Sequence, residues 1–385
     1  MAWCSAPSCR ARPFSRPTTT ASTERDITAL LAPRGWTLAR ILFLVYVALV
    51  AYASLYPLSG WRDVGLSPFA FLGEPWPRYF TRFDIVANVA GYLPFGFLAI
   101  ATLQPRLRGL AAFAVSVAGA SVLSLVLEAA QSYLPARFPA TADVLCNLGG
   151  AALGAALGLH FAPLMTGGPL SRWRAGTFVA GGGTDFGLVL IGLWLFIQLN
   201  PATLLFGAGD LRDLLTPFEG RARSPEFFVS IEAFTTAAHL VAVALILAAL
   251  VAPGRPVRGL VLGTVLAALT VKTAAVAIVL RAESVFAWLT HGAQLGLVIG
   301  IAAALGAVAL PRTVRLAGAA VLLMAATVLV NLSPPNPYLA ASLKVWQQGH
   351  FLNFNGLTRL VSAAWPFIAL GYLIYLASRR REALG

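Results

Sequence analysis

Long apolar stretches without charge constrain this chain more than any other feature of its sequence. Three examples are ILFLVYVALVAYASLYP (41–57), LVAVALILAALVA (240–252) and LGLVIGIAAALGAVAL (295–310). About 20 helical residues cross the ~30 Å hydrocarbon core of a bilayer, and these runs approach that length. Because 58% of the residues are hydrophobic and only 11% are charged, the composition is that of an integral membrane protein.

Apolar windows separated by polar residues or by Pro and Gly predict about ten membrane-spanning helices. The windows cover residues 40–57, 84–103, 109–133, 143–163, 185–200, 232–252, 257–280, 285–309, 314–332 and 358–377. The predicted fold class is therefore all-α, a polytopic transmembrane helical bundle.

The distribution of arginine predicts the orientation of these helices. Short loops on one side carry arginine pairs with almost no acid, as in QPRLRG (104–109), SRWRAG (171–176) and PGRPVRG (253–259). Loops rich in Lys and Arg stay in the cytoplasm, so both termini are expected there. The net charge of +13 is scattered between apolar runs and forms no basic aromatic stripe, which argues against a nucleic-acid partner.

Composition divides the chain into four predicted regions. They are a disordered basic cytoplasmic tail (1–38), a four-helix membrane bundle (39–165), a cytoplasmic linker (166–183) and a second membrane bundle of about six helices (184–385).

The second bundle resembles a degenerate repeat of the first. Outward helices end alike in SLYP (54–57), QLNP (198–201) and NLSP (331–334). Laying 123–154 over 269–300 matches Gly150 and Gly154 with Gly296 and Gly300, but it places Ala or Leu opposite the polar residues. Either the second copy lost its polar residues, or Gly/Ala-rich helices align through composition alone.

Polar residues converge on one level of the first bundle, near the outer ends of three predicted helices. Ser121, Ser124, Glu128 and Gln131 share one helical face, while Asp84 with Asn88 and Asp143 with Asn147 are i, i+4 pairs. Arg137 lies in the short loop between the last two helices and is the expected partner of the carboxylates. Gly150, Gly154 and Gly158 then form a small-residue stripe where another helix can approach closely.

The ordered polar set resembles that of the VanZ-like membrane proteins. The elements are Asp84, Asn88, PFG (94–96), Glu128-x-x-Gln131, Arg137 and Asp143-x-x-x-Asn147, over about residues 40–165. The resemblance implies a compact bundle of about four helices in a bacterial inner membrane, and a role in the cell envelope or in resistance to teicoplanin-like glycopeptides. Many members have a further acid between the Arg and the Asp, where this chain has FPATA (138–142), so a mechanism requiring a third loop-side carboxylate is in doubt.

The predicted function is binding of an anionic or lipid-linked, peptidoglycan-related molecule in an outward-facing polar pocket. Its predicted ligand-binding residues are Asp84, Asn88, Glu128, Gln131, Arg137, Asp143 and Asn147. Glu128 is the candidate acid or base if a reaction takes place. Arg137 can bind a phosphate or carboxylate group through its planar fork.

Other interpretations remain open at this stage. The polar residues can instead fix helix register as a buried ion network in a non-catalytic scaffold, or belong to a transporter of an amphipathic envelope molecule. No nucleophile–base pair and no metal-site spacing is evident, so neither an enzyme nor a cofactor is assigned. Membrane lipids are the expected surroundings, and the oligomeric state is not predicted.

Overall fold

A computed structural model describes residues 37–63, 65, 67–75, 81–104, 106–166, 168–212, 224–279, 285–334 and 352–382. These residues belong to one unit, Gly35–Gly385. The predicted basic tail, 1–38, lies outside the described residues except for its last two positions, which begin the first described helix.

Each of the ten predicted windows coincides with a helix, and within the described ranges an isolated β-bridge is the only extended pairing. The helices are α2 (Thr37–Leu55), α3 (Arg82–Leu103), α4 (Gly109–Gln131), α5 (Thr141–Thr166), α7 (Gly182–Ile197), α8 (Pro225–Leu250), α9 (Val257–Val279), α10 (His291–Ala307), α11 (Arg312–Leu332) and α13 (Leu352–Glu382). The all-helical prediction is confirmed. Eight of these helices are long and apolar enough to cross a membrane, whereas α7 and α10 are shorter. The orientation of the termini stays a prediction.

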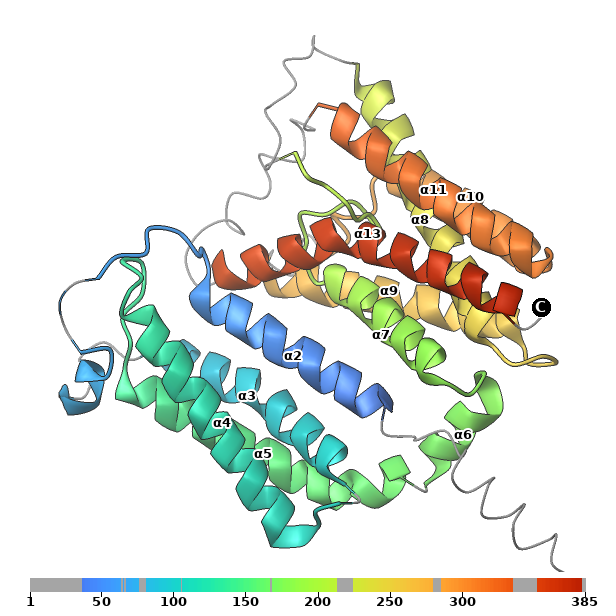
Figure 1. The fold of residues 1–385 in the computed structure, drawn as a ribbon. Coiled ribbons are helices and arrows are strands. Elements are labelled where there is room, and N and C mark those ends of the chain that lie inside the picture. Colours follow the sequence, from blue (N-terminus) through green and yellow to red (C-terminus); the bar gives the residue numbers. More distant parts are fainter. Residues whose placement is uncertain are drawn as a thin grey trace, which may run out of the picture. The chain divides into compact units, whose positions relative to one another are not determined.

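The first bundle is built on close contact between α3 and α5 (Figure 1). A Cβ added at Gly150 would overlap the carbonyl oxygen of Val89, and one added at Gly154 would overlap that of Leu93. From the other side, a Cβ at Gly96 of α3 would overlap the carbonyl oxygen of Ala151. The predicted small-residue stripe is therefore confirmed, and its partner helix is α3.

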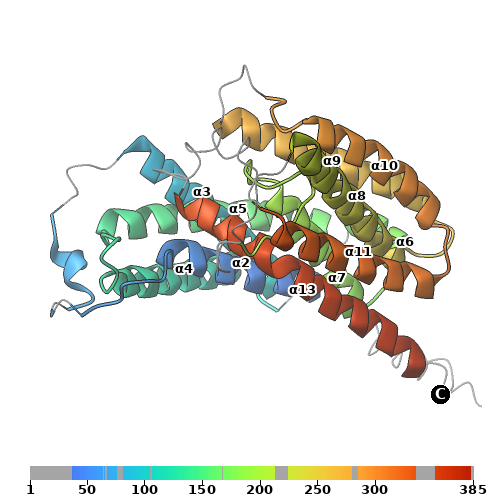
Figure 2. The same ribbon diagram turned by 90° about the horizontal axis from the view of Figure 1, so that it is seen from above.

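The second bundle surrounds α8, most of which is buried (Figure 2). Helix α10 packs against it at glycines, because a Cβ at Gly296 would meet the carbonyl oxygen of Ala233 at 2.5 Å and one at Gly300 would meet Ala237 at 3.0 Å. Helix α11 also packs on α8, and α2 contacts both α7 and α13. Matching glycine contacts in the two bundles agree with a repeat, which stays a prediction.

The predicted linker, 166–183, contains an additional short helix. Helix α6 (Pro169–Thr177) precedes a single β-bridge between Phe178 and Val251. Arg174 of α6 forms an ion pair with Asp185 at the start of α7. Burial lowers the pKa of Arg174, and the pairing neutralises the carboxylate next to it.

An irregular, largely buried segment follows α7. Residues 198–209 contain no regular helix, yet most of them are buried. Trp194 donates to the carbonyl oxygen of Phe206 at 3.0 Å, and Thr236 of α8 donates to that of Leu205 at 3.1 Å. Exposed non-helical backbone is excluded from hydrocarbon, so this segment requires donors from the surrounding helices.

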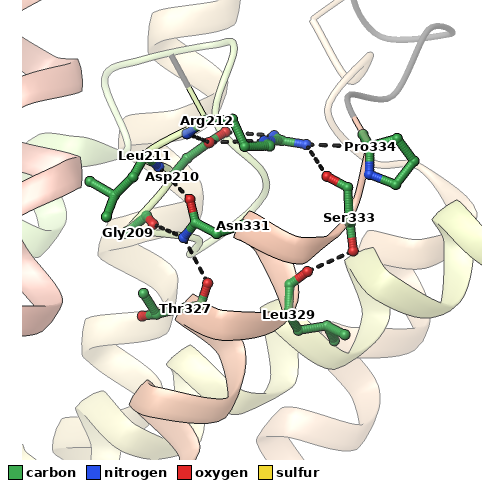
Figure 3. A network of polar contacts seen from close by, with 9 residues as sticks. All are labelled: Gly209, Asp210, Leu211, Arg212, Thr327, Leu329, Asn331, Ser333 and Pro334. Atoms are coloured by element: carbon green, nitrogen blue, oxygen red, sulfur yellow. Dashed lines mark hydrogen bonds and ion pairs between the residues drawn. The ribbon is translucent and has the colours of Figure 1, made fainter. Parts of the chain in front are cut away.

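The end of this segment is tied to the end of α11 (Figure 3). The Asn331 side chain accepts from the backbone N–H of Leu211 at 2.7 Å and donates to the carbonyl oxygen of Gly209 at 2.6 Å. Arg212 donates to both carboxylate oxygens of Asp210, and its Nη1 donates to the carbonyl oxygens of Ser333 and Pro334 at 3.4 and 3.3 Å.

The Asp210–Arg212 pair predicts a pH-dependent contribution to stability. Burial raises the pKa of Asp210, but the hydrogen bonds and charge of Arg212 outweigh burial, so the pKa is lower than usual. A lowered folded-state pKa stabilises the fold above the unfolded pKa, near 4, and this stabilisation is lost as pH falls through the folded-state value. Asp210→Asn should therefore lower the unfolding temperature slightly at pH 7, and the gap to wild type should narrow below about pH 4. A gap of constant size across this range would show that the pair adds no stability.

Candidate functional site

The predicted site residues lie where α3 and α5 begin and where α4 ends. Asp84 is part of a capping box at the start of α3: its carboxylate accepts from the Thr81 backbone N–H at 2.9 Å, and the Thr81 hydroxyl accepts from the Asp84 N–H at 3.2 Å. One helical turn later, Asn88 donates to the carboxylate of Asp143 at 2.5 Å. Asp84 thus starts the helix, and Asn88 joins α3 to α5.

Glu128 lies inside the bundle, on the face of α4 that the sequence predicts. Its side chain is buried, with 5% of the residue exposed, and Oε2 accepts from the backbone N–H of Ala140 at 3.2 Å. One turn earlier, Ser124 accepts from Asn147 Nδ2 at 2.9 Å, linking α4 to α5. The structure therefore brings together Asn88, Glu128, Asp143 and Asn147 from three helices.

Arg137 and Gln131 bind the end of α2 instead of the acids. The Arg137 guanidinium donates from Nε and Nη2 to the carbonyl oxygen of Tyr56 at 3.0 and 2.7 Å, and from Nη2 to that of Ala53 at 3.0 Å. Gln131 donates to the carbonyl oxygen of Ser54 at 3.0 Å. Burial lowers the pKa of Arg137, while the negative charge of Glu128 acts in the opposite direction.

The expected pairing of Arg137 with the carboxylates is wrong. In the described part of the chain, no cation lies within ion-pair distance of Glu128 or Asp143. The physical reason is the free helix end: the last carbonyl groups of α2 have no helical partner and carry partial negative charge, so they attract a cation. Glu128 and Asp143 retain backbone and amide donors only.

Described parts of the loop between α2 and α3 lie against the end of α4 and the start of α5. The hydroxyl of Thr141, at the start of α5, donates to the carbonyl oxygen of Phe71 at 2.9 Å, and Phe71 is buried in a short 3-10 helix, η1 (Ala70–Gly73). The backbone N–H of Arg62 donates to the carbonyl oxygen of Tyr133 at 2.9 Å. These bonds place described parts of the loop beside the end of α4 and the start of α5, the helix that carries Asp143.

The chemistry of the cluster is that of a hydrogen-bond acceptor. Glu128 and Asp143 provide carboxylate oxygens, and the buried Asn147 Oδ1 has no donor among the described residues. A buried carbonyl group without a donor costs roughly 1–3 kcal/mol unless water or a ligand satisfies it. Across the described ranges, no three His, Cys, Asp or Glu side chains gather closely enough to hold a metal ion.

Lys272 of α9 is a buried cation that the sequence pattern does not single out, because a lone Lys in an apolar helix gives no sign of its partners. It is 1% exposed, and its ammonium donates to the carbonyl oxygens of Asn200 and Thr203 at 2.7 and 2.6 Å. The second bundle therefore has buried polar residues of its own, at positions other than those aligned with Glu128 and Asn147. One sequence signal is common to the three buried or partly buried cations, namely the motifs SLYP, QLNP and NLSP at which predicted helices end. Arg137, Lys272 and Arg212 each bind carbonyl groups at one of these motifs.

Comparison with known proteins gives a family match for the part of the chain that contains Asn88, Glu128, Asp143 and Asn147. Residues 42–166 match the model of the VanZ/LLP1 family. The matched range begins inside α2 and ends with α5, so the VanZ-like segment includes every predicted site residue. No curated protein and no solved structure matches the chain. The apolar helices indicate a multi-pass membrane protein, and its segment 42–166 is VanZ-like.

Proposed function

We propose that the VanZ-like segment binds a lipid-linked, peptidoglycan-related envelope molecule from the outer face of a bacterial cytoplasmic membrane. The observation that carries the proposal is the pair of acids, Glu128 and Asp143, which lack a cation within ion-pair distance in the described structure. A carboxylate at membrane depth is unfavourable by roughly 2.5–3.5 kcal/mol near the bilayer centre and by less toward the interface. Two such groups without a cation within ion-pair distance favour a binding role over a register-fixing ion network.

The donors and acceptors define the class of ligand. Glu128, Asp143 and the open Asn147 Oδ1 would accept hydrogen bonds from hydroxyl or amide groups of a sugar or peptide head group. Arg137 Nη1 has no acceptor among the described residues, so it can donate to an anionic group at the rim. The cluster would then bind a head group that carries hydrogen-bond donors together with a phosphate or carboxylate. This is the class of ligand that the sequence predicts.

The physiological role follows from the head group. A protein that sequesters or presents such a molecule would change susceptibility to teicoplanin-like antibiotics, whose targets are envelope intermediates. Binding alone accounts for this role, and the proposal includes no reaction.

Charge-removing variants test the proposal with little change of shape. Glu128→Gln and Asp143→Asn each keep an oxygen acceptor at the same place while removing the negative charge. Loss of a charge-assisted hydrogen bond weakens binding by roughly 1.5–3 kcal/mol, or about tenfold or more. Teicoplanin susceptibility of a sensitive bacterial host should therefore return toward that of cells without the protein, at unchanged membrane abundance.

Two matched controls separate binding from folding. Asp63→Asn makes the same chemical change at an exposed carboxylate, and Ser121→Ala removes a hydroxyl that bonds within α4. Both should behave as wild type.

The scaffold alternative is supported by Asp84, Gln131 and Arg137, each of which forms hydrogen bonds with backbone groups. Wild-type susceptibility in both acid variants, or a loss that follows abundance, would favour the scaffold. A transporter is less favoured, because the cluster lies near helix ends and not at mid-helix.

A further inference from the structure

A second feature lies at the start of α7, far from Glu128 and Asp143. A groove of about 370 Å³ is lined by Gly182, Gly183, Phe186, Ile368, Gly371, Tyr372 and Tyr375. Figure 1 shows the start of α7 on the side of the later half of α13, at the other end of the helices from the start of α5 and the end of α4. The lining is almost entirely apolar or aromatic.

The groove arises because α7 is short and α13 is long. The Tyr372 hydroxyl donates to the carbonyl oxygen of Gly183 at 2.8 Å, which aligns the first turn of α7 with that level of α13. Helix α13 continues to Glu382, about 15 Å further at 1.5 Å per residue. Glycines at positions 182, 183 and 371 contribute no side chains, and a Cβ added at Gly371 would meet no atom within 4 Å.

The walls of the groove are exposed apolar groups. Phe186 and Tyr375 are 36% and 38% exposed, while Tyr372 is buried and stacks on Tyr375 with ring centroids 6.2 Å apart. In a membrane-spanning chain, an exposed apolar groove of this kind suits an acyl chain or another protein.

Positive charge lies beyond the groove along α13. The Arg379 guanidinium is 5.2 Å from the ring centroid of Tyr375, and Arg312 Nη2 donates to the carbonyl oxygen of Leu376 at 3.5 Å. Asp185, at the start of α7, forms an ion pair with Arg174. The apolar groove therefore leads to a basic region formed by Arg379 and Arg312.

We propose that this groove binds an anionic glycerophospholipid, with an acyl chain along Phe186, Ile368 and Tyr375 and the phosphate beside Arg379 and Arg312. Basic pockets between transmembrane helices bind anionic head groups in this way. Charge complementarity favours this occupant over a second copy of the chain, whose same basic surface would be repelled. The proposal is independent of the acid cluster and its ligand.

Native mass spectrometry of the purified full chain tests the proposal with phosphatidylglycerol and phosphatidylcholine as probes. Gly371→Leu adds a side chain to the groove at a position where a Cβ would meet no atom within 4 Å, so it should weaken phosphatidylglycerol binding about tenfold. Arg379→Gln should weaken it about fivefold and leave phosphatidylcholine unchanged. Gly119→Leu, at an exposed α4 glycine with nothing within 4 Å, and Arg106→Gln, at another exposed arginine, should both bind as wild type.

Several results would overturn the proposal. Wild-type affinity in Gly371→Leu would exclude the groove, and equal losses in Gly371→Leu and Gly119→Leu would indicate a general effect of added bulk. Equal affinity of the wild-type chain for both lipids would exclude anionic selectivity. A dimer of the wild-type chain that Gly371→Leu dissociates would show that a second copy fills the groove.

Discussion

Gly154→Leu should prevent accumulation of folded protein in the membrane. A Cβ at this position would overlap the carbonyl oxygen of Leu93 and lie 2.8 Å from its carbonyl carbon, so α3 and α5 would have to separate. One extra methylene in a packed core costs about 1–3 kcal/mol, and a collision with backbone, which cannot change rotamer, should exceed the top of that range. The measurement is the monodisperse fraction by detergent gel filtration of membrane extracts.

A neighbouring glycine provides the matched control. Gly149 is on the exposed side of α5, where a Cβ would meet no atom within 4 Å. Gly149→Leu should accumulate as wild type, because it adds the same bulk to the same helix without reaching α3. If both variants accumulate normally, the close α3–α5 contact is not required for folding.

Lys272→Met should lower the stability of the second bundle by about 2–4 kcal/mol. The substitution leaves the carbonyl oxygens of Asn200 and Thr203 without the ammonium donor, inside an environment that excludes water. Removing a buried ammonium also relieves its desolvation, which is why the expected loss is smaller than the sum of the lost bonds. Thermal unfolding in detergent, followed by tryptophan fluorescence, measures the change.

Chemical rescue distinguishes the lost cation from lost packing. Lys272→Ala removes three carbons and the ammonium, which propylammonium can replace, whereas Lys272→Met has no room for it. Propylammonium added before heating should restore stability to Lys272→Ala only, and uncharged 1-propanol should restore neither. Thr270→Met, at an exposed α9 residue, should unfold as wild type. If Thr270→Met and Lys272→Met unfold at the same temperature, the hydrogen bonds of Lys272 do not stabilise the second bundle.

The helices were predictable because membrane insertion imposes a local rule. Each apolar window near the length of a membrane crossing became a helix, since backbone groups in hydrocarbon must bond within their own segment. The short helix α6 was not predicted, because its sequence, PLSRWRAGT, is polar and its position depends on Arg174 meeting Asp185.

The sequence predicted which residues of the candidate site lie at one level, but it did not predict the partner of Arg137. Asn88, Glu128, Asp143 and Asn147 were expected at one level from helical spacing and chain direction, and they lie together. Arg137 was expected beside the acids and instead binds the end of α2. Whether the cluster binds a ligand is a matter for the susceptibility experiment.

The sequence by itself determined the helices, the glycine face of α5 and the level of the acids, because these depend on local hydropathy and on a 3.6-residue period. Only the tertiary structure decided where the cations lie. Arg137, Lys272 and Arg212 each bind carbonyl groups at a helix end distant in the sequence, at Tyr56, Asn200 and Pro334. Every helix ends in backbone carbonyl groups, whatever its last residues are. The residue type at a helix end therefore does not show which side chain will bind there. The choice follows from which side chain the packing brings within reach.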